Sequence, residues 1–348
     1  MASLQDIAKR ANVSAMTVQR ALRGDRHVRP ELAERIVKIA HEMRYEPNLL
    51  AKGVLHRKSM TVAILVPEVD KPSISRSISG AMEILRDKDY RAILLESRRD
   101  VEREFQEIRQ AAMRRVDGIV LLTTKLSVEA GHFEELKLRK IPVVIINRPG
   151  RNLPFEIFAG DHHDGAHQVV RRMIEDGHRR IAFLDTLHEP MSDNIPARIP
   201  GWERALREAD IDPATQLTEQ VDVRSLETAR QVIRRWLTRD DRPTAIFCET
   251  SFLALAVYQV AREMDLAIGR DLSVGAAMFG GQFVYDQYFD PPLSGFNGPS
   301  RELGRRAADR LVEIMSKKNP MKAIEPGRIT WLPVEHVEGQ SIGEAPSR

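Results

Sequence analysis

The sequence of 348 residues lacks features that would place it in several large classes of protein. Its one cysteine, Cys248, excludes an internal disulfide and a cysteine-based metal cluster, and such low usage is typical of a reducing cytoplasm. It contains no apolar run of about 18 residues, so we expect no membrane-spanning helix. The first ten residues, MASLQDIAKR, lack the apolar stretch of a secretory signal. We therefore expect a cytoplasmic protein.

Motifs of catalysis are also missing. The chain has no glycine-rich phosphate loop, no nucleophile elbow and no pair of acids spaced for acid–base chemistry, so we expect neither an enzyme nor a bound cofactor. His163 and His167 lie four residues apart on a predicted helix, a spacing found in zinc sites. No third ligand is apparent near them or their neighbour His162, and we interpret the three as ordinary helix residues.

The charges divide the chain into two unequal parts. The whole chain holds 53 Lys and Arg and 50 Asp and Glu, a net charge of only +3. Residues 1–58 hold 12 basic and 6 acidic residues, a net charge of +6, so the remainder carries −3. A small basic segment on a mildly acidic body is typical of a nucleic-acid-binding module joined to another domain.

The first 46 residues have the pattern of a helix–turn–helix. Apolar residues recur at helical spacing over 4–11 and 15–23, and a third helix is expected from Pro30 to about Tyr45. Asn12 tolerates the left-handed backbone of a tight turn, and Ser14 is a ready N-cap for the second helix. The second helix of such a unit enters the major groove of DNA. The alternative is a plain three-helix bundle whose charges are merely solvated.

Several residues of this head are candidates for contact with DNA. Arg20 is the best candidate for reading guanine with its two-pronged guanidinium, and Ala15 and Met16 are placed to touch a thymine methyl group. Others are placed for phosphates, which position a protein without specifying sequence. The candidates in the head are Leu4, Ser14, Ala15, Met16, Thr17, Gln19, Arg20, Arg26, His27 and Arg29.

After residue 58 the pattern changes to short apolar runs that alternate with amphipathic, helix-like stretches. This alternation indicates parallel sheets covered on both faces, and the number of units favours two doubly wound subdomains. Ligands of such sheets bind at the carboxyl ends of the strands. The runs that predict strands are 61–66, 91–95, 118–122, 141–146, 180–184 and 244–248.

Short fragments spaced along the whole chain carry a further signal. The head contains Leu4-Gln5-Asp6-Ile7-Ala8, Asn12-Val13-Ser14, Thr17-Val18, Arg20, Val28, Ile36 and Tyr45-Glu46-Pro47-Asn48. The body contains Asp117-Gly118-Ile119, Ile141-Pro142-Val143-Val144, Asp161 with Gly165-Ala166, Gly177-His178-Arg179-Arg180-Ile181-Ala182, Arg198 with Gly201-Trp202, and Pro291-Pro292-Leu293. Each fragment is weak alone. Their order and spacing together resemble the lactose/galactose repressor family of bacterial transcription regulators.

The resemblance implies a fold and a division into domains. A small all-α helix–turn–helix head (1–46) would be followed by a linker (47–58) and an effector-binding and dimerisation body (59–348) made of two doubly wound parallel-sheet subdomains, like a periplasmic sugar-binding protein. The chain would cross between the subdomains three times. We expect the N-subdomain to hold about 59–160 and 294–324, and the C-subdomain about 161–293 and 325–341.

The resemblance also assigns a role to the linker. In the family this segment becomes a hinge helix only on DNA, and the paired hinge helices of a dimer insert an apolar side chain, usually leucine, into the minor groove. Here Val54 takes that position with Leu55 beside it, and Asn48 and Ala51 match other hinge positions. Gly53 lowers helix propensity, so we expect a hinge that depends strongly on the dimer and the DNA. A flexible tether is the alternative.

The effector is expected to meet the loops that follow the strands. Arg198 matches the family's effector-binding arginine, and a planar guanidinium suits paired hydroxyls or a carboxylate. A surface arginine is its alternative, and a turn-capping asparagine is the alternative for Asn147. The full set of candidates is Glu68, Ser73, Arg98, Asn147, Arg198 and Thr250.

Departures from the family pattern bear on the kind of ligand. Ser73-Ile74 replaces paired aromatic residues, Thr250-Ser251 replaces an Asn-Asp pair, and the acidic pair expected near Met278 is absent. An arginine among few acids favours a sugar acid, although a neutral sugar stays open. We therefore expect a repressor that binds a pseudo-palindromic DNA operator as a homodimer, under the control of a sugar or sugar acid, and that is associated with the nucleoid when bound to DNA. The alternatives are a cytoplasmic solute-binding protein and a doubly wound enzyme.

Overall fold

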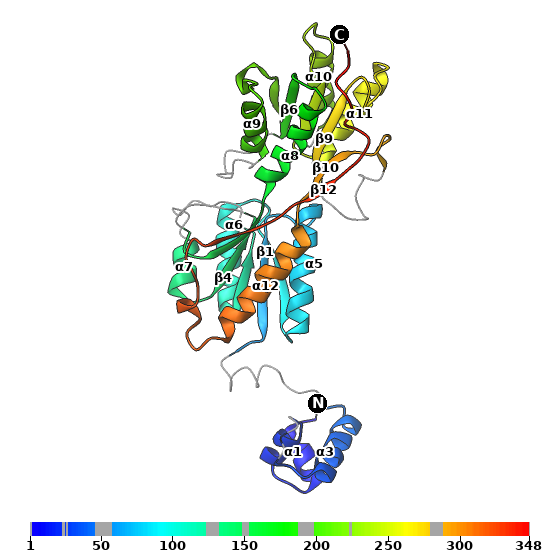
Figure 1. Cartoon of the computed structure of the whole chain (residues 1–348). Helices are drawn as coiled ribbons and strands as arrows, with labels where there is room; N and C mark the ends of the chain where they lie inside the picture. Colours follow the sequence, from blue (N-terminus) through cyan, green and yellow to red (C-terminus); the bar gives the residue numbers. More distant parts are fainter. Residues whose placement is uncertain are drawn as a thin grey trace. The chain divides into compact units, whose positions relative to one another are not determined.

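The structure is a computed structural model, and it describes residues 2–22, 25, 27–45, 58–122, 132–147, 153–186, 198–222, 225–278 and 288–347. The chain divides into two compact units, Met1–Ser59 and Met60–Arg348, which we call the head and the body (Figure 1). None of the helices in the described part of the chain has the length and apolarity that crossing a bilayer requires.

The described residues of the head form three helices, α1 (Leu4–Ala11), α2 (Ala15–Leu22) and α3 (Pro30–Glu42). α1 ends at Asn12, whose φ of 56° places it in the left-handed region, as the sequence predicts. The Ser14 side chain caps α2 by accepting a hydrogen bond of 3.1 Å from the Thr17 backbone N–H. Ile7, Val18 and Ile36, one from each helix, are fully buried, so the head has a core of its own.

The first sheet of the body is entirely parallel, with strand order β11-β5-β4-β3-β1-β2. Helices α5 and α12 pack against each other beside this sheet (Figure 1). The strands are β1 (Thr61–Val66), β2 (Arg91–Glu96), β3 (Gly118–Leu121), β4 (Val143–Ile146), β5 (Glu156–Gly160) and β11 (Ile329–Leu332). The helices of this subdomain are α5 (Pro72–Asp87), α6 (Val101–Met113), α7 (His132–Leu138) and α12 (Ser300–Ser316).

The second sheet has the order β12-β10-β9-β8-β6-β7, and only its β10–β12 pair is antiparallel among the described strands. Its strands are β6 (Ile181–Thr186), β7 (Thr218–Val221), β8 (Ala245–Cys248), β9 (Ser273–Met278), β10 (Ser294–Asn297) and β12 (Glu335–Val337). Its helices are α8 (His162–Glu175), α9 (Arg198–Glu208), α10 (Leu226–Leu237) and α11 (Ser251–Glu263). All six apolar runs of the sequence are strands of the two sheets, and the predicted fold class is confirmed.

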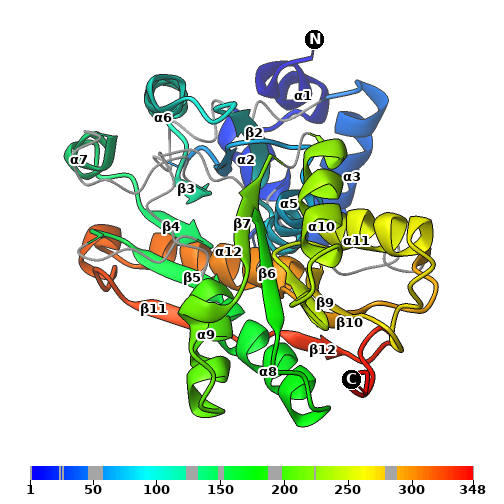
Figure 2. The same cartoon turned by 90° about the horizontal axis from the view of Figure 1, so that it is seen from above.

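The two faces of the second sheet are covered by different helices. Phe183 and Phe247 pack with the core under α8 and α9, whereas Leu184 and Cys248 pack with the core under α10 and α11. Figure 2 shows these two pairs of helices on opposite sides of the strands. Successive side chains of a strand point to opposite faces of the sheet. The alternation therefore also tells to which face the residue that follows each strand points.

The crossover points between the subdomains differ from those expected. Strand β10 was expected in the N-subdomain, but it pairs with β9 of the second sheet. Conversely, β11 was expected in the C-subdomain, but it pairs with β5 of the first sheet. The crossovers therefore follow β5, β10 and β11, so residues 294–297 and 329–332 exchange places relative to the expectation. Both strands have only 4 residues, too few to show a sheet preference in the sequence.

The contact between α5 and α12 depends on two glycines. A Cβ atom on Gly304 would lie 1.9 Å from the Ser77 carbonyl oxygen, and one on Gly80 would lie 2.0 Å from the Arg301 carbonyl oxygen. Each glycine thus lets the backbone of the other helix approach closely.

We expect Gly304→Ala to destabilise the body by about 1–3 kcal/mol, because one of two backbones must move to admit the methyl group. Urea unfolding measures the change. Ser316→Ala, at the exposed end of the same helix, is the control and should stay within about 0.5 kcal/mol of the native chain. A Gly304→Ala protein as stable as this control would show that the helices do not need the glycine.

Candidate functional site

The exposed face of α2 is the candidate DNA-reading surface. The Met16 side chain is 59% exposed and Arg20 is also exposed, while Val18 and Ala21 of the same helix are buried. The Arg20 Nε atom lies 3.9 Å from Asp25 Oδ2, a loose contact that a base or phosphate could replace. Gln19 and Thr17 are half-buried on this helix. The exposed face of α2 therefore presents side chains that can contact bases, and its buried face packs in the core of the head.

Other predicted DNA contacts have local roles in the head as well. Leu4 and Ala15 are half-buried and pack against the core of the head. The His27 ring lies 2.7 Å from Asp25 Oδ1, and hydrogen bonds from His27 lower the pKa of the Asp25 carboxyl group. Arg29 is exposed just before α3. Arg26, Asn48, Ala51, Val54 and Leu55 lie outside the described residues.

One group of effector candidates lies at the carboxyl ends of the first sheet. Glu68 follows β1 and forms ion pairs with Arg99, at 2.5 Å, and with Lys71, at 3.5 Å. Arg98 follows β2, and its side chain is 71% exposed with one long contact of 3.4 Å to Glu96. Ser73, in the first turn of α5, is half-buried.

Asn147 and Thr250 have evident structural roles. Asn147 follows β4 with a left-handed φ of 58°, and its Oδ1 accepts a hydrogen bond of 3.3 Å from the Gly160 backbone N–H. These contacts match the turn role that was its alternative. Thr250 is the N-cap of α11 and accepts a hydrogen bond from the Leu253 N–H. Both side chains thus accept hydrogen bonds from backbone N–H groups near the ends of strands.

Arg198 is the effector candidate that is paired with a buried acid. It begins α9, its side chain is only 18% exposed, and its Nη1 atom donates to Glu249 Oε1. Glu249, at the end of β8, has a side chain only 6% exposed and accepts a second hydrogen bond of 3.0 Å from Thr186 Oγ1. The alternative of an ordinary surface arginine is therefore wrong.

Sequence reasoning missed two buried acids at the ends of β6 and β8, of which Glu249 contacts this arginine. Leu184 of β6 and Cys248 of β8 are partners in the strand register, so Asp185 and Glu249 are the next pair along. By the alternation along each strand, both side chains point to the face of the sheet that α8 and α9 cover, and Arg198 is the first residue of α9. Asp185 is 2% exposed and accepts a hydrogen bond of 3.0 Å from Gln220 Nε2. The expectation that the arginine stands among few acids is wrong.

His162 completes the surroundings of Arg198. It begins α8, and Cβ atoms built on Gly160 and Gly298 would lie within 3.2 Å and 2.9 Å of its ring. Burial and the positive charge of Arg198 lower the pKa of His162 to about 3, so the ring is neutral at neutral pH. His167 instead lies 2.6 Å from Glu208 Oε2. Within the described residues, no three metal-ligating side chains come together.

Family models match both units of the chain. Residues 3–48 match the model of bacterial regulatory proteins of the lacI family, and residues 170–342 match the model of the periplasmic binding protein-like domain. The chain therefore carries a DNA-binding domain of the lacI family and a periplasmic binding protein-like domain. The expected resemblance is thereby confirmed.

Curated relatives match along most of the chain. Catabolite control protein A of Priestia megaterium is 28% identical over 91% of this chain and 93% of its own length. The ribose operon repressor of Haemophilus influenzae is 28% identical over 92% of this chain and 93% of its own. The structure resembles that of a lac repressor dimer bound to operator and an anti-inducer, with a TM-score of 0.82, 21% identity and 98% of each chain covered. This last likeness supports the fold.

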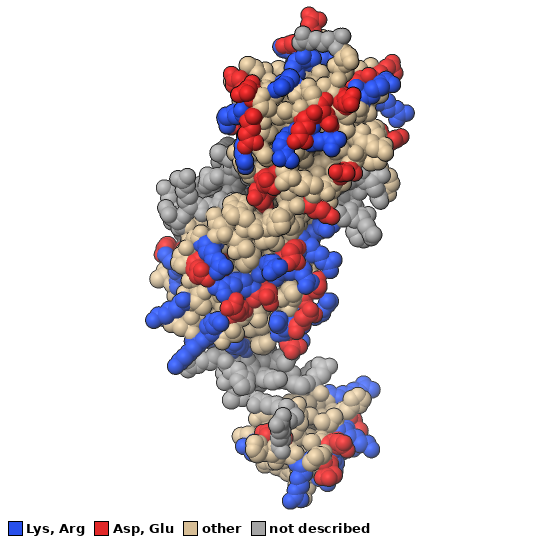
Figure 3. Space-filling view, in the orientation of Figure 1, with Lys and Arg blue, Asp and Glu red and all other residues tan. Residues whose placement is uncertain are grey.

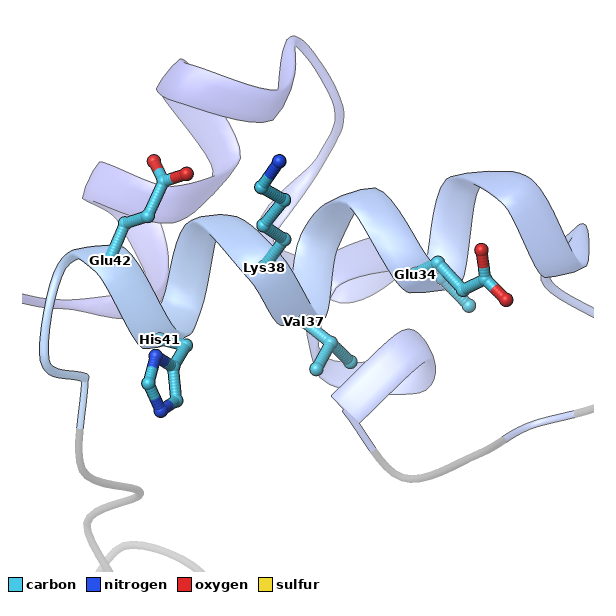
Figure 4. Close-up of a pocket in the computed structure, with 6 residues that line it drawn as sticks. Glu34, Val37, Lys38, His41 and Glu42 are labelled. Carbon is cyan, nitrogen blue, oxygen red and sulfur yellow. The ribbon is translucent and has the colours of Figure 1, made fainter.

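Two hollows of the described structure are lined by none of the effector candidates. One, of about 590 Å³, lies on α3, where Val37 and His41 point to one side of the helix and Lys38 and Glu42 to the other (Figure 4). A second, of about 620 Å³, lies between α12 and β11, and its Arg310 is bound to Glu156. On the face of the body drawn in Figure 3, blue and red side chains alternate. Among the described residues of that face, lysines and arginines form no patch of their own.

Proposed function

We propose that this protein is a lacI-family repressor that binds a pseudo-palindromic operator as a homodimer and is controlled by a small metabolite. The observation that carries the proposal is a head of net charge +6, with the exposed face of α2, joined to a body of one parallel and one largely parallel sheet. Two heads related by two-fold symmetry match the two halves of such an operator. The relatives named above are a control protein and a repressor, and we assign no catalytic role.

The edge of the first sheet supports the homodimer. β2 is an edge strand with Leu94 48% exposed, and Met82 on the adjoining α5 is also 48% exposed. Val69, whose N–H donates to Glu96 at the end of β2, is 39% exposed. Large apolar side chains gathered at one edge are typical of a surface that another subunit covers.

We assign the effector to the surroundings of Arg198, and we place it among the sugars and related metabolites. Regulators of similar structure hold ribose and cellobiose, with TM-scores of 0.68 and 0.66. An effector bound there would change the relative positions of the subdomains and so the pairing of the hinge segments at 47–58. Because such coupling is reciprocal, operator DNA would change effector affinity by the same factor. The protein would act in the cytoplasm, on the nucleoid.

Replacing Arg20 by alanine tests the reading surface. We expect Arg20→Ala to weaken binding to the cognate operator by about 1–3 kcal/mol and to relax the preference at one base pair in each half-site, because one bidentate base contact is lost. Operator selection from random DNA, followed by anisotropy titrations, measures both effects.

Arg10→Ala is the matched control. Arg10 lies on α1 rather than α2, and its side chain is 57% exposed, against 58% for Arg20. It should leave the base preference of the selected operators unchanged. An Arg20→Ala protein that loses affinity equally for all sequences would refute base reading by Arg20, and a native chain that selects no DNA sequence would refute the proposed function.

A further inference from the structure

Glu249 places a negative charge directly on the arginine that the proposed function assigns to the effector. Arg198 Nη1 donates to Glu249 Oε1, and both side chains are largely buried, at 18% and 6% exposed. The Thr186 hydroxyl donates to the other carboxylate oxygen, which holds the carboxylate in place. Bulk water is therefore a weak competitor for this pair, and the charges offset each other at short range.

The fold makes this contact a fixed feature rather than a chance surface pairing. Glu249 directly follows β8, and its backbone N–H donates to the Leu184 carbonyl of β6 at 2.9 Å. Arg198 begins α9, which packs on α8 over the same face of the sheet that Glu249 continues. Gly201 allows that close packing, because a Cβ there would lie 2.2 Å from the His163 carbonyl oxygen. The two groups are thus positioned by two packed elements.

Hydrogen-bonding capacity remains on Arg198 itself and on two further residues of the same subdomain after the charges of the pair are matched. Arg198 Nε, His162 Nδ1 and Asn297 Oδ1 are buried atoms without a hydrogen-bond partner in the described structure. Buried polar atoms of this kind are normally satisfied, and a bound ligand is one way to satisfy them. The neutral imidazole of His162 adds a polar group without adding charge.

We propose that Glu249 sets the charge selectivity of this site: by occupying the Arg198 guanidinium, it excludes carboxylates and phosphates and leaves a site for an uncharged, hydroxyl-bearing ligand. A free carboxylate would have to displace a buried carboxylate that is already bound, and the displaced group would lose its partner. Neutral hydroxyls can use the unpaired atoms without disturbing the pair. The inference rests on the proposed function, in which the effector meets Arg198, and it replaces the sugar acid that the sequence favoured.

The test compares the full chain with Glu249→Gln. The amide keeps the size of the side chain but removes the charge that holds Arg198. Thermal unfolding is followed in 10 mM inorganic phosphate or D-gluconate, against potassium chloride of equal ionic strength. We expect neither anion to raise the Tm of the native chain, and we expect at least one to raise that of Glu249→Gln by about 2–4 °C.

Two further variants assign the effect to Arg198. Glu156→Gln breaks the other strongly buried pair, with Arg310, whose side chains are 2% and 17% exposed, and it should respond to anions as the native chain does. Adding Arg198→Met to Glu249→Gln should abolish the gained response. Should Glu249→Gln fail to fold, Glu249→Ser provides the same removal of charge in a smaller side chain.

Two outcomes would overturn the inference. One is a native chain that the anions stabilise as much as they stabilise Glu249→Gln, and the other is a Glu249→Gln chain that gains no response. Operator binding measured on the same preparations separates this result from the proposed function. A native chain that binds no operator would refute the repressor, whereas the response of the two chains to anions would still decide the role of Glu249.

Discussion

A chain that starts at Met60 should lose operator binding by at least about 1000-fold, the ratio that separates specific from non-specific binding in such proteins. The head carries the whole net positive charge of the protein, +6 against −3 for the remainder after residue 58. It also carries the exposed face of α2. The truncated body should still unfold cooperatively, because its cores include no residue of the head.

Anisotropy titrations against the selected operator at several salt concentrations measure this loss. The full chain should show a steep decrease of affinity with salt, because lysines and arginines of the head release counterions from DNA. The truncated body should show no specific binding at any salt concentration. Specific binding by the body alone would contradict the assignment of DNA recognition to the head, provided that its thermal unfolding shows a folded protein.

Much of the fold is predictable from the sequence because most strands are buried on both faces. Runs such as 61–66 and 244–248 are continuously apolar, and they form central strands whose residues are buried almost throughout. The sequence does not reveal the edge strand β7 or the strands β5, β10 and β11, after which the chain crosses between the subdomains. β7, with the sequence TEQV, is an edge strand with exposed residues. β5 contains Glu156, a buried charge whose partner Arg310 lies 154 residues away.

The candidate site can be proposed from the sequence in its position but not in its charge. The rule that ligands meet the carboxyl ends of strands finds Arg198, Asn147 and Thr250, all of which lie at such ends or at helix starts that follow them. Glu249 stands beside Thr250 in the sequence, yet its role depends on the register between β6 and β8 and on the packing of α9. A contact between residues 51 positions apart has no local signal.

The Arg198–Glu249 pair also makes a strong prediction about stability. We expect Arg198→Ala to abolish the response of operator binding to the effector and to destabilise the body by about 3–5 kcal/mol, because it leaves a buried carboxylate without its partner. Urea unfolding measures the stability. The response to the effector is read as the change in operator affinity on adding whichever compound stabilises the native chain in a thermal-shift screen of sugars.

The double variant Arg198→Ala, Glu249→Ala separates the two effects. Removing both charges leaves no buried ion unpaired, so most of the lost stability should return, while the response to the effector should not. Arg310→Ala is the control for stability, since it leaves Glu156 unpaired in the other subdomain, and it should preserve the response to the effector. If the double variant regains both stability and response, Arg198 supports the fold and does not contact the ligand.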